Sequence, residues 1–152
     1  VATIEKAAGG YGKGYGEALT YWREIIAGLD TLRNRKGMIV ILIAHSKIEK
    51  FEDPEAPTYD RYSPRLHKSS GALLSEWCDA VLFATRRMRT TTTEVNGKAR
   101  TTATALGKDG GDRVIRPFGG PACVAKNRYG LNAEFPLSWD AFTAAISAAN
   151  SN

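Results

Sequence analysis

The stretch "MIVILIAH", residues 38–45, is the feature of the sequence that decides the fold class. It is a continuous apolar run, rich in β-branched residues, in which polar and apolar positions do not alternate. A run that is apolar on both faces is typical of a central strand in a covered, parallel sheet. We therefore predict a buried strand over residues 38–45, with His45 at its carboxyl end.

The residues before this run have the periodicity of a helix. Between Tyr15 and Arg35, apolar side chains recur at spacings of three and four residues, which places them on one face of a helix. Gly37 follows directly and is of the residue type that commonly ends helices. A helix followed by a fully buried strand predicts an α/β fold.

The stretch after His45, residues 46–68, is polar, contains three prolines and carries charges of both signs. It predicts a long loop without regular structure, and so long a loop in a compact domain is more often functional than idle. Apolar periodicity, β-branched runs and turn signals predict the remaining elements. These are a helix over 66–77, a strand over 79–85, two threonine-rich strands around Asn96–Gly97, strands over 112–118 and 122–130, and a helix over 139–149 capped by Ser138.

The bulk composition limits the class of protein. The length of 152 residues fits one domain with a sizeable core, and the formal net charge of +5 favours polyanionic partners. Two cysteines form neither a disulfide framework nor a zinc cluster, which favours a reducing compartment and hence a cytoplasmic location. No apolar run reaches the ~18 residues that a membrane span needs, so no membrane partner is expected.

The glycine-rich stretch "AAGGYGKGYGEAL", residues 7–19, raises the possibility of a phosphate-binding P-loop. A P-loop reads G-x-x-x-x-G-K-[ST] and lies between a strand and a helix. If Gly12–Lys13 were its Gly-Lys pair, a glycine would be needed at position 7 and a hydroxyl at position 14. Those positions hold Ala7 and Gly14. The stretch therefore predicts a glycine-rich surface loop that is closed by the start of a helix.

Three groups of residues have side chains suited to binding or catalysis. His45 lies at the end of the predicted strand, where open α/β sheets bind ligands, although a histidine that only caps the strand end fits equally well. Lys126 and Arg128 lie two apart and, on a strand, would point to one side and suit a phosphoryl group; a solvated strand end is the alternative. The stretch 46–68 interleaves cations with aromatic rings, as single-strand-binding surfaces do, but a solvated mixed-charge loop is an equal alternative. Its candidates for nucleic-acid contact are Lys47, Lys50, Tyr59, Arg61, Tyr62, Arg65, His67 and Lys68.

Taken together, several motifs resemble those of the phage nucleotide-binding proteins of the RecA-like ATPase class, which are recombination-associated ATPases of the single-strand-annealing type. The motifs are "GGYGKGY", "ILIAH", "YDRYSPRLHKSSGALLSEWCDAVLFA" and "VAKNRYG" followed by "FPLSW", and the resemblance covers nearly the whole chain. It implies one RecA-like ATPase core portion over residues 1–152, with a mostly parallel sheet flanked by helices and a C-terminal β-hairpin. The P-loop lysine, the magnesium-binding hydroxyl and the Walker B aspartate have no match here, so the chain resembles the C-terminal portion of such a protein.

The resemblance also implies roles for the candidate residues. Residues 9–16 would match the first DNA-facing loop, with Lys13 at a phosphate. His45 would match the sensor that couples the γ-phosphate to a second DNA loop, here 46–68. Lys126 and Arg128 would match a pair that reaches into a neighbouring subunit's active site.

The partners implied are single-stranded DNA, further copies of the chain in a ring or filament, and ATP with Mg²⁺ in the intact protein but not on this chain alone. Two alternatives stay open. One is a basic nucleic-acid-binding module without nucleotide chemistry, and the other is an assembly fragment whose hairpin mediates subunit contacts.

Overall fold

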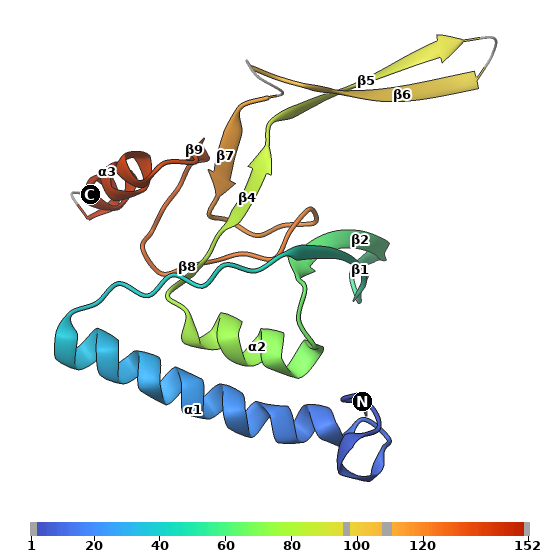
Figure 1. The fold of residues 1–152 in the computed structure, drawn as a ribbon. Helices are drawn as coiled ribbons and strands as arrows, with labels where there is room; N and C mark the ends of the chain where they lie inside the picture. Colours follow the sequence, from blue (N-terminus) through green and yellow to red (C-terminus); the bar gives the residue numbers. More distant parts are fainter. Residues whose placement is uncertain (1–2, 96–97, 108–110, 151–152) are drawn as a thin grey trace. The chain divides into compact units, whose positions relative to one another are not determined.

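The computed structural model describes residues 3–95, 98–107 and 111–150 (Figure 1). The chain forms two compact units, Val1–Cys78 and Asp79–Asn152. The first unit holds the short 3-10 turn η1 (Ala7–Gly9), helices α1 (Lys13–Lys36) and α2 (Lys68–Trp77), and strands β1 (Ser46–Asp53) and β2 (Ala56–Pro64). The second holds helix α3 (Trp139–Ala149) and strands β3 (Ala80–Val81), β4 (Phe83–Arg86), β5 (Met88–Val95), β6 (Lys98–Ala105), β7 (Arg113–Arg116), β8 (Lys126–Asn127) and β9 (Phe135–Pro136).

Helix α1 confirms the helix predicted from apolar periodicity, and it ends where Gly37 predicts. Gly37 has a left-handed backbone with φ of 63°, and its N–H donates to the carbonyl of Arg33 while the N–H of Met38 donates to that of Leu32. This pair of hydrogen bonds satisfies carbonyls that the helix leaves without partners, and only glycine adopts such a backbone without strain. Helix α2 confirms the second predicted helix, with its first residue two positions later than expected.

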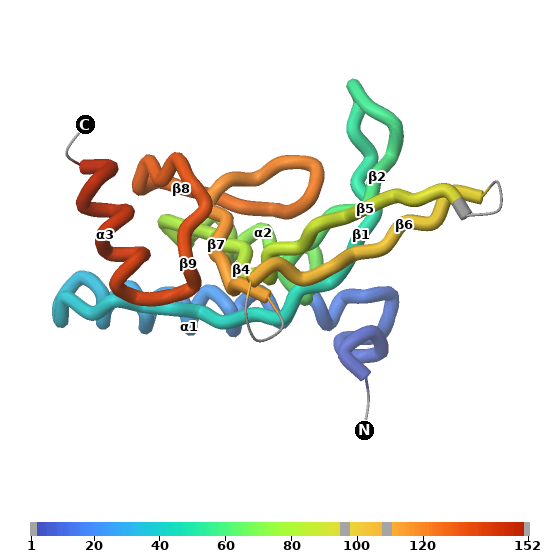
Figure 2. The backbone as a smooth tube through the Cα atoms, turned by 90° about the horizontal axis from the view of Figure 1, so that it is seen from above, coloured from blue at the N-terminus to red at the C-terminus, as the bar shows by residue number. Residues whose placement is uncertain are grey.

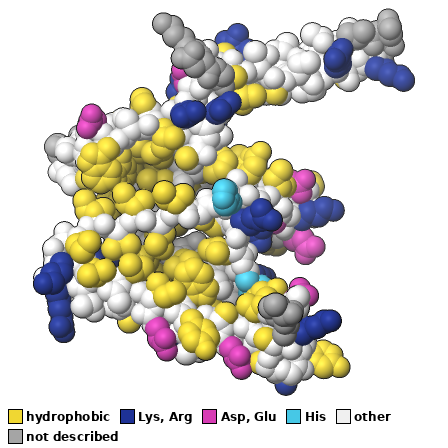
Figure 3. All heavy atoms as spheres, viewed as in Figure 1, with side chains coloured by type: hydrophobic (Ala, Val, Ile, Leu, Met, Phe, Trp, Pro, Cys, Tyr) yellow, Lys and Arg dark blue, Asp and Glu magenta, His cyan; other side chains and the backbone are white. Residues whose placement is uncertain are grey.

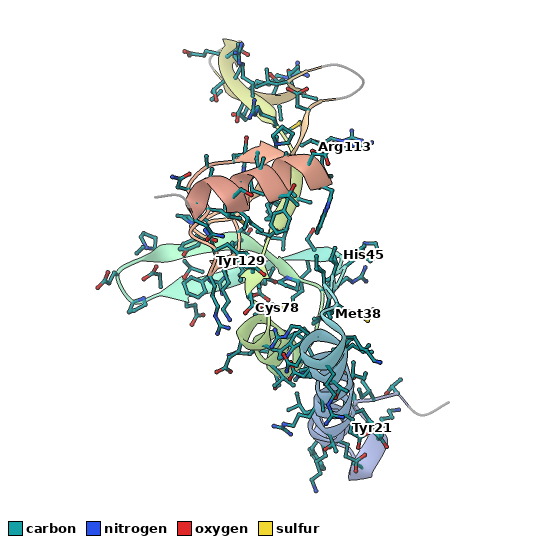
Figure 4. All side chains as sticks on the ribbon, turned by 90° about the vertical axis from the view of Figure 1, so that its left-hand side faces the viewer. Tyr21, Met38, His45, Cys78, Arg113 and Tyr129 are labelled. Atoms are coloured by element: carbon teal, nitrogen blue, oxygen red, sulfur yellow. The ribbon has the colours of Figure 1, made fainter. Side chains whose placement is uncertain are left out.

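The prediction of a buried strand over residues 38–45 is wrong for the described chain. The segment runs from α1 to β1 without any strand pairing to the described residues, and Figure 4 labels Met38 and His45 near its two ends. The side chains of Ile39, Ile41 and Ile43 are 70%, 66% and 96% exposed. An extended segment becomes a strand only when a neighbour supplies hydrogen bonds, and no described strand lies in register with this one.

The prediction of an irregular loop over 46–68 is also wrong, because β1 and β2 form an antiparallel hairpin there. The turn is made by Pro54 and Glu55, and the side chain of Asp53 accepts a hydrogen bond of 3.0 Å from the N–H of Glu55. The prolines do not prevent pairing, because one lies in the turn and the other two lie near the ends of β2.

In the second unit, β4, β7 and β9 form a small sheet, and α3 lies beside β9 (Figure 2). A buried cluster of Ile115, Leu131 and Phe135 packs against the apolar face of α3. The Ser138 side chain accepts a hydrogen bond from the N–H of Ala141 at 3.1 Å, which confirms the predicted helix cap. Of the strand predicted over 122–130, only β8 forms, paired with β3.

Strands β5 and β6 form a two-stranded ribbon, which confirms the threonine-rich hairpin predicted around Asn96–Gly97; those two residues lie outside the described ones. The ribbon continues the β4–β7 pair, since the N–H of Arg87 donates to the carbonyl of Asp112 and the N–H of Leu106 donates to the carbonyl of Arg87. Figure 1 shows β5 and β6 extending away from β4 and β7.

The mixture of helices and strands agrees with the predicted α/β class, but the expected parallel sheet is not found. Every strand pairing among residues 3–95, 98–107 and 111–150 is antiparallel. The two runs that were expected as buried strands have different environments: residues 38–45 belong to no strand, and the 79–85 run divides into β3 and β4, each with an antiparallel partner from later in the chain.

Candidate functional site

His45 lies at the base of the β1–β2 hairpin. Its carbonyl accepts a hydrogen bond of 2.7 Å from the N–H of Arg65, one residue beyond the first ladder pair between Ser46 and Pro64. The imidazole is exposed, and Figure 4 shows it where the segment from α1 enters β1. A displacement of the His45 backbone would therefore act directly on the hairpin.

One face of the hairpin is half-buried and its side chains are already engaged. The Lys47 ammonium lies 3.1 Å from a Glu49 carboxylate oxygen and lowers the pKa of that carboxyl, while also donating to the carbonyl of Leu66 at 3.1 Å. The Arg61 guanidinium lies 3.7 Å from the centre of the Phe51 ring, and the Tyr59 ring packs 5.5 Å from the same ring. Three of the predicted DNA-contacting residues, Lys47, Tyr59 and Arg61, thus have partners within the hairpin.

The opposite face of the hairpin is exposed. It carries Ile48, Lys50 and Tyr62, because side chains on a strand alternate between its two faces. Tyr62 lies opposite Ile48 in the register and is 41% exposed, and Lys50 lies opposite Asp60. The sequence does not distinguish the two tyrosines, but in the structure Tyr62 is exposed and Tyr59 is half-buried.

The remaining cations of the 46–68 stretch lie where the chain enters α2. Arg65 and Lys68 are exposed, and Lys68 is the first residue of the helix. The His67 ring stacks on the Tyr15 ring of α1, with centroids 3.9 Å apart and planes 6° from parallel. This stacking brings the start of α1 and the start of α2 together, so Lys13 and Lys68, each the first residue of its helix, belong to one end of the first unit.

The predicted pair Lys126 and Arg128 lies on a short, well-defined turn. Lys126 is half-buried in β8, and the Asn127 side chain accepts a hydrogen bond from the N–H of Leu131 at 3.1 Å and donates one to the carbonyl of the same residue at 2.5 Å. Gly130 completes the turn with φ of 69°, a value that favours glycine. Arg128 is 57% exposed, and its guanidinium lies 3.2 Å from a carboxylate oxygen of Asp79.

Residues 2–129 match the AAA domain family. The chain belongs to the AAA domain family. Comparison with curated proteins and with solved structures gives no match. The membership indicates a nucleotide-binding, ATPase-like function of the P-loop NTPase type, and AAA domains in general bind ATP with Mg²⁺.

The glycine-rich loop of this AAA-domain chain does not fit the phosphates of ATP. A P-loop cradles phosphates with free backbone N–H groups. Here the N–H groups of Gly10, Gly12 and Lys13 donate to the carbonyls of Ala7, Glu5 and Gly10. The helix also begins at Lys13, so the last four residues of the predicted loop 9–16 are helical instead.

Three residues important to the local geometry were not among the candidates predicted from the sequence. Asn127 closes the turn that holds Arg128, and Asp79 binds that arginine from the start of the unit. Glu134 is a third, since it lies 2.8 Å from Arg87 and 2.9 Å from Arg116 and both contacts lower the pKa of its carboxyl. The partners of the two acidic residues lie 18 to 49 positions away in sequence, so no local motif reports these ion pairs, whereas Asn127 binds Leu131 only four positions away.

Neither a metal-binding group nor a membrane-spanning helix is found among the described residues. Residues 3–95, 98–107 and 111–150 contain no group of three or more His, Cys, Asp and Glu side chains that could hold a metal ion. Within the same ranges, no helix combines the length and the apolar composition needed to cross a bilayer.

Proposed function

We propose that this chain is the portion of a phage RecA-like ATPase that follows the Walker B strand, and that the intact protein acts on single-stranded DNA in recombination or repair. Membership in the AAA domain family supports the nucleotide-dependent part of this proposal. The β1–β2 hairpin is the observation that carries the DNA-binding part. It begins directly after His45, and its exposed face carries Lys50 and Tyr62, with Asp60 opposite Lys50 and Ile48 opposite Tyr62 in the register.

The hairpin has the chemistry that single strands need. An unpaired base offers its flat face to an aromatic ring, and a cation nearby meets the phosphate. Tyr62 and Lys50 supply one of each on the same exposed face. The His45 carbonyl fixes the base of this hairpin, which supports a role for His45 in coupling bound nucleotide to bound DNA.

The Asn127 turn supports the second part of the proposal, in which Arg128 contacts a nucleotide held by a neighbouring copy in a ring or filament. The turn is held by two hydrogen bonds from one side chain, and Arg128 is more than half exposed on it. A guanidinium can bind phosphate oxygens through two N–H groups at once. In this arrangement the neighbour holds ATP and Mg²⁺, and Lys126 adds a second positive charge on the same turn.

Binding by the chain itself is the first test. The chain is titrated into a labelled oligo(dT) strand by fluorescence anisotropy at several salt concentrations. Each lost phosphate contact should flatten the slope of log K against log salt by roughly 0.7. We expect this change for Lys50→Ala and a much smaller one for the matched variant Lys47→Ala, because Lys47 is held by Glu49 and Leu66. Equal slopes for the parent and Lys50→Ala would contradict the hairpin assignment.

Hydrolysis is the second test. Residues 1–152 should release no phosphate from ATP above buffer, with or without DNA, because they hold no P-loop. A protein extended upstream of Val1 to include one should hydrolyse ATP, and single-stranded DNA should stimulate it. Turnover by residues 1–152 that disappears in Lys13→Ala would show instead that the glycine-rich loop binds nucleotide.

A basic nucleic-acid-binding module without nucleotide chemistry is the second candidate. The bonded N–H groups of the glycine-rich loop favour it, because they leave this chain without a phosphate cradle of its own. The two candidates separate on the extended protein: binding of oligo(dT) with no measurable ATP binding would support the module.

A further inference from the structure

The β5–β6 ribbon has one face that is basic and rich in hydroxyls. Arg89, Thr91 and Thr93 on β5 lie opposite Thr104, Thr102 and Arg100 on β6, and Lys98 follows two positions beyond Arg100. Because the side-chain period of a strand is two, all of these lie on the same face. Three cations and no acidic residue are therefore gathered on one side of the ribbon.

The other face differs in charge. It carries Met88, Thr90, Thr92 and Glu94, which lie opposite Ala105, Ala103, Thr101 and Ala99. The single acidic side chain of the described ribbon thus lies on the face away from the cations. In the view of Figure 3, Lys and Arg side chains gather at the far end of the ribbon and again near its base.

The basic face is accessible and its cations have no ion-pair partner on the ribbon. Residues 88–94 and 98–104 are exposed, and within the described part of the chain no acidic side chain forms an ion pair with Arg89, Lys98 or Arg100. Two of the threonines on this face are occupied, since Thr93 donates to the carbonyl of Arg100 and Thr102 to that of Thr91. Those bonds hold the ribbon together, which leaves the three cations as the main groups for a ligand.

The spacing of the cations matches an extended polyanion. Arg89 pairs with Thr104 and Arg100 pairs with Thr93, so the two arginines lie four positions apart, or about 13 Å at the usual rise of a strand. Lys98 lies two positions further, or about 7 Å. A ligand that meets all three must carry negative charge repeated over about 20 Å, as a nucleic-acid backbone does.

The ribbon carries no aromatic side chain and therefore suits duplex DNA better than single-stranded DNA. Residues 88–105 contain no Phe, Tyr or Trp, and single-strand-binding surfaces depend on aromatic stacking. A duplex is bound instead through its phosphates by Arg, Lys and hydroxyl side chains, and its major groove, about 12 Å wide, admits a two-stranded ribbon. From this we infer that the β5–β6 ribbon is a binding surface for duplex DNA, separate from the single-strand surface proposed on β1–β2.

The test compares two charge-matched triple variants of the 152-residue chain. The ribbon variant is Arg89→Ala, Lys98→Ala and Arg100→Ala, and the control is Arg23→Ala, Arg35→Ala and Lys36→Ala on exposed positions of α1. Binding to a labelled 24-base-pair duplex and to oligo(dT) is measured by anisotropy between 50 and 200 mM salt, roughly the range over which counterion release acts strongly. Circular dichroism checks that each variant is folded. If the ribbon variant is not folded, the single variant Arg100→Glu is used in its place.

We expect the ribbon variant to bind duplex DNA with a log K against log salt slope that is flatter than the parent's by roughly 2.7, since each phosphate contact contributes about 0.9. The control should change this slope by less than about 1, and oligo(dT) binding by the ribbon variant should stay near the parent's. Three results would overturn the proposal: a parent that does not bind duplex DNA, equal losses in the two triple variants, or an equal loss for duplex and oligo(dT). Sedimentation velocity provides a fourth, because a ribbon variant that changes oligomeric state would identify the ribbon as a contact between copies.

Discussion

Replacing Tyr62 and, separately, Tyr59 with alanine tests whether the exposed face of the β1–β2 hairpin binds single strands. The two residues have the same type and lie three apart on β2, so each variant controls for the other. They differ in environment: Tyr62 is 41% exposed, while Tyr59 packs its ring 5.5 Å from Phe51. Tyr62 therefore exposes more of its side chain to a base than the half-buried Tyr59 does.

The size of the effect follows from the exposure. Stacking of one base on an aromatic ring contributes about 1–3 kcal/mol. Because more than half of Tyr62 is covered, we take the lower part of this range, about 1–2 kcal/mol, which weakens Kd by about 5- to 30-fold. No charge is removed, so the salt dependence should not change. Tyr59→Ala should weaken binding by less than about 2-fold and instead lower stability by about 1–2 kcal/mol, because it removes a half-buried ring contact.

Anisotropy titration of oligo(dT) gives the affinities, and thermal unfolding followed by circular dichroism gives the stabilities. Binding by Tyr62→Ala at the parent's affinity would refute the assignment of the exposed face. Equal losses of affinity in both variants would show that the hairpin's integrity, and not a stacked ring, determines binding.

Other predictions test the packing, the electrostatics and the proposed subunit contact. Gly14→Ala should lower the melting temperature, because its added Cβ would clash with the Ile4 carbonyl, whereas Gly16→Ala meets nothing within 4 Å and should stabilise α1 by roughly 0.5–1 kcal/mol. Glu134 contributes stability above its unfolded pKa, near 4.5, and loses that contribution as the pH falls through its lowered folded pKa; Glu134→Gln should remove about 1 kcal/mol at pH 7 and flatten this acid dependence in unfolding experiments. In the extended protein, Arg128→Ala should reduce ATP hydrolysis by ~10³-fold or more with little change in nucleotide affinity, Arg128→Lys should not restore it, and mixing with P-loop-dead subunits should recover part of the activity. If upstream residues pair with the segment 38–45 in the extended protein, hydrogen exchange should find the amide of Ile41 unprotected in residues 1–152 and protected in the extended protein, and equal protection in both would contradict that pairing.

Local chemistry allowed much of the secondary structure to be predicted. The start and end of α3 follow from Ser138 and apolar spacing, the end of α1 follows from Gly37, and the ribbon follows from threonine-rich runs on both sides of Asn96–Gly97. Each of these signals is contained within a few residues, and the elements could therefore be predicted without knowledge of their tertiary contacts.

The β1–β2 hairpin was missed because its inner face is polar. Along β1, exposed and half-buried side chains alternate without interruption. Hydropathy does not alternate in the same way, because Lys47 and Glu49 occupy half-buried positions that an ordinary strand fills with apolar residues. The candidate site was limited in the same way. The contacts of Arg128 with Asp79 and of Arg116 with Glu134 join residues 49 and 18 positions apart, which no local pattern reports.

The segment 38–45 has the composition of a buried strand but an exposed environment, and the proposed function accounts for both. A run this apolar is costly in water, since fully burying one isoleucine side chain gains about 1.5–3 kcal/mol. Ile39, Ile41 and Ile43 are mostly exposed, yet the segment already runs from α1 to the base of the β1–β2 hairpin. Strands from an upstream ATPase portion, paired on either side of it, would satisfy its backbone, and helices packed on the faces of that sheet would cover these side chains. The strand expected from the sequence and the exposed segment in the structure would then be the same element, with and without its neighbours. His45, at the end of that element, would stand between the nucleotide and the hairpin that we propose binds DNA.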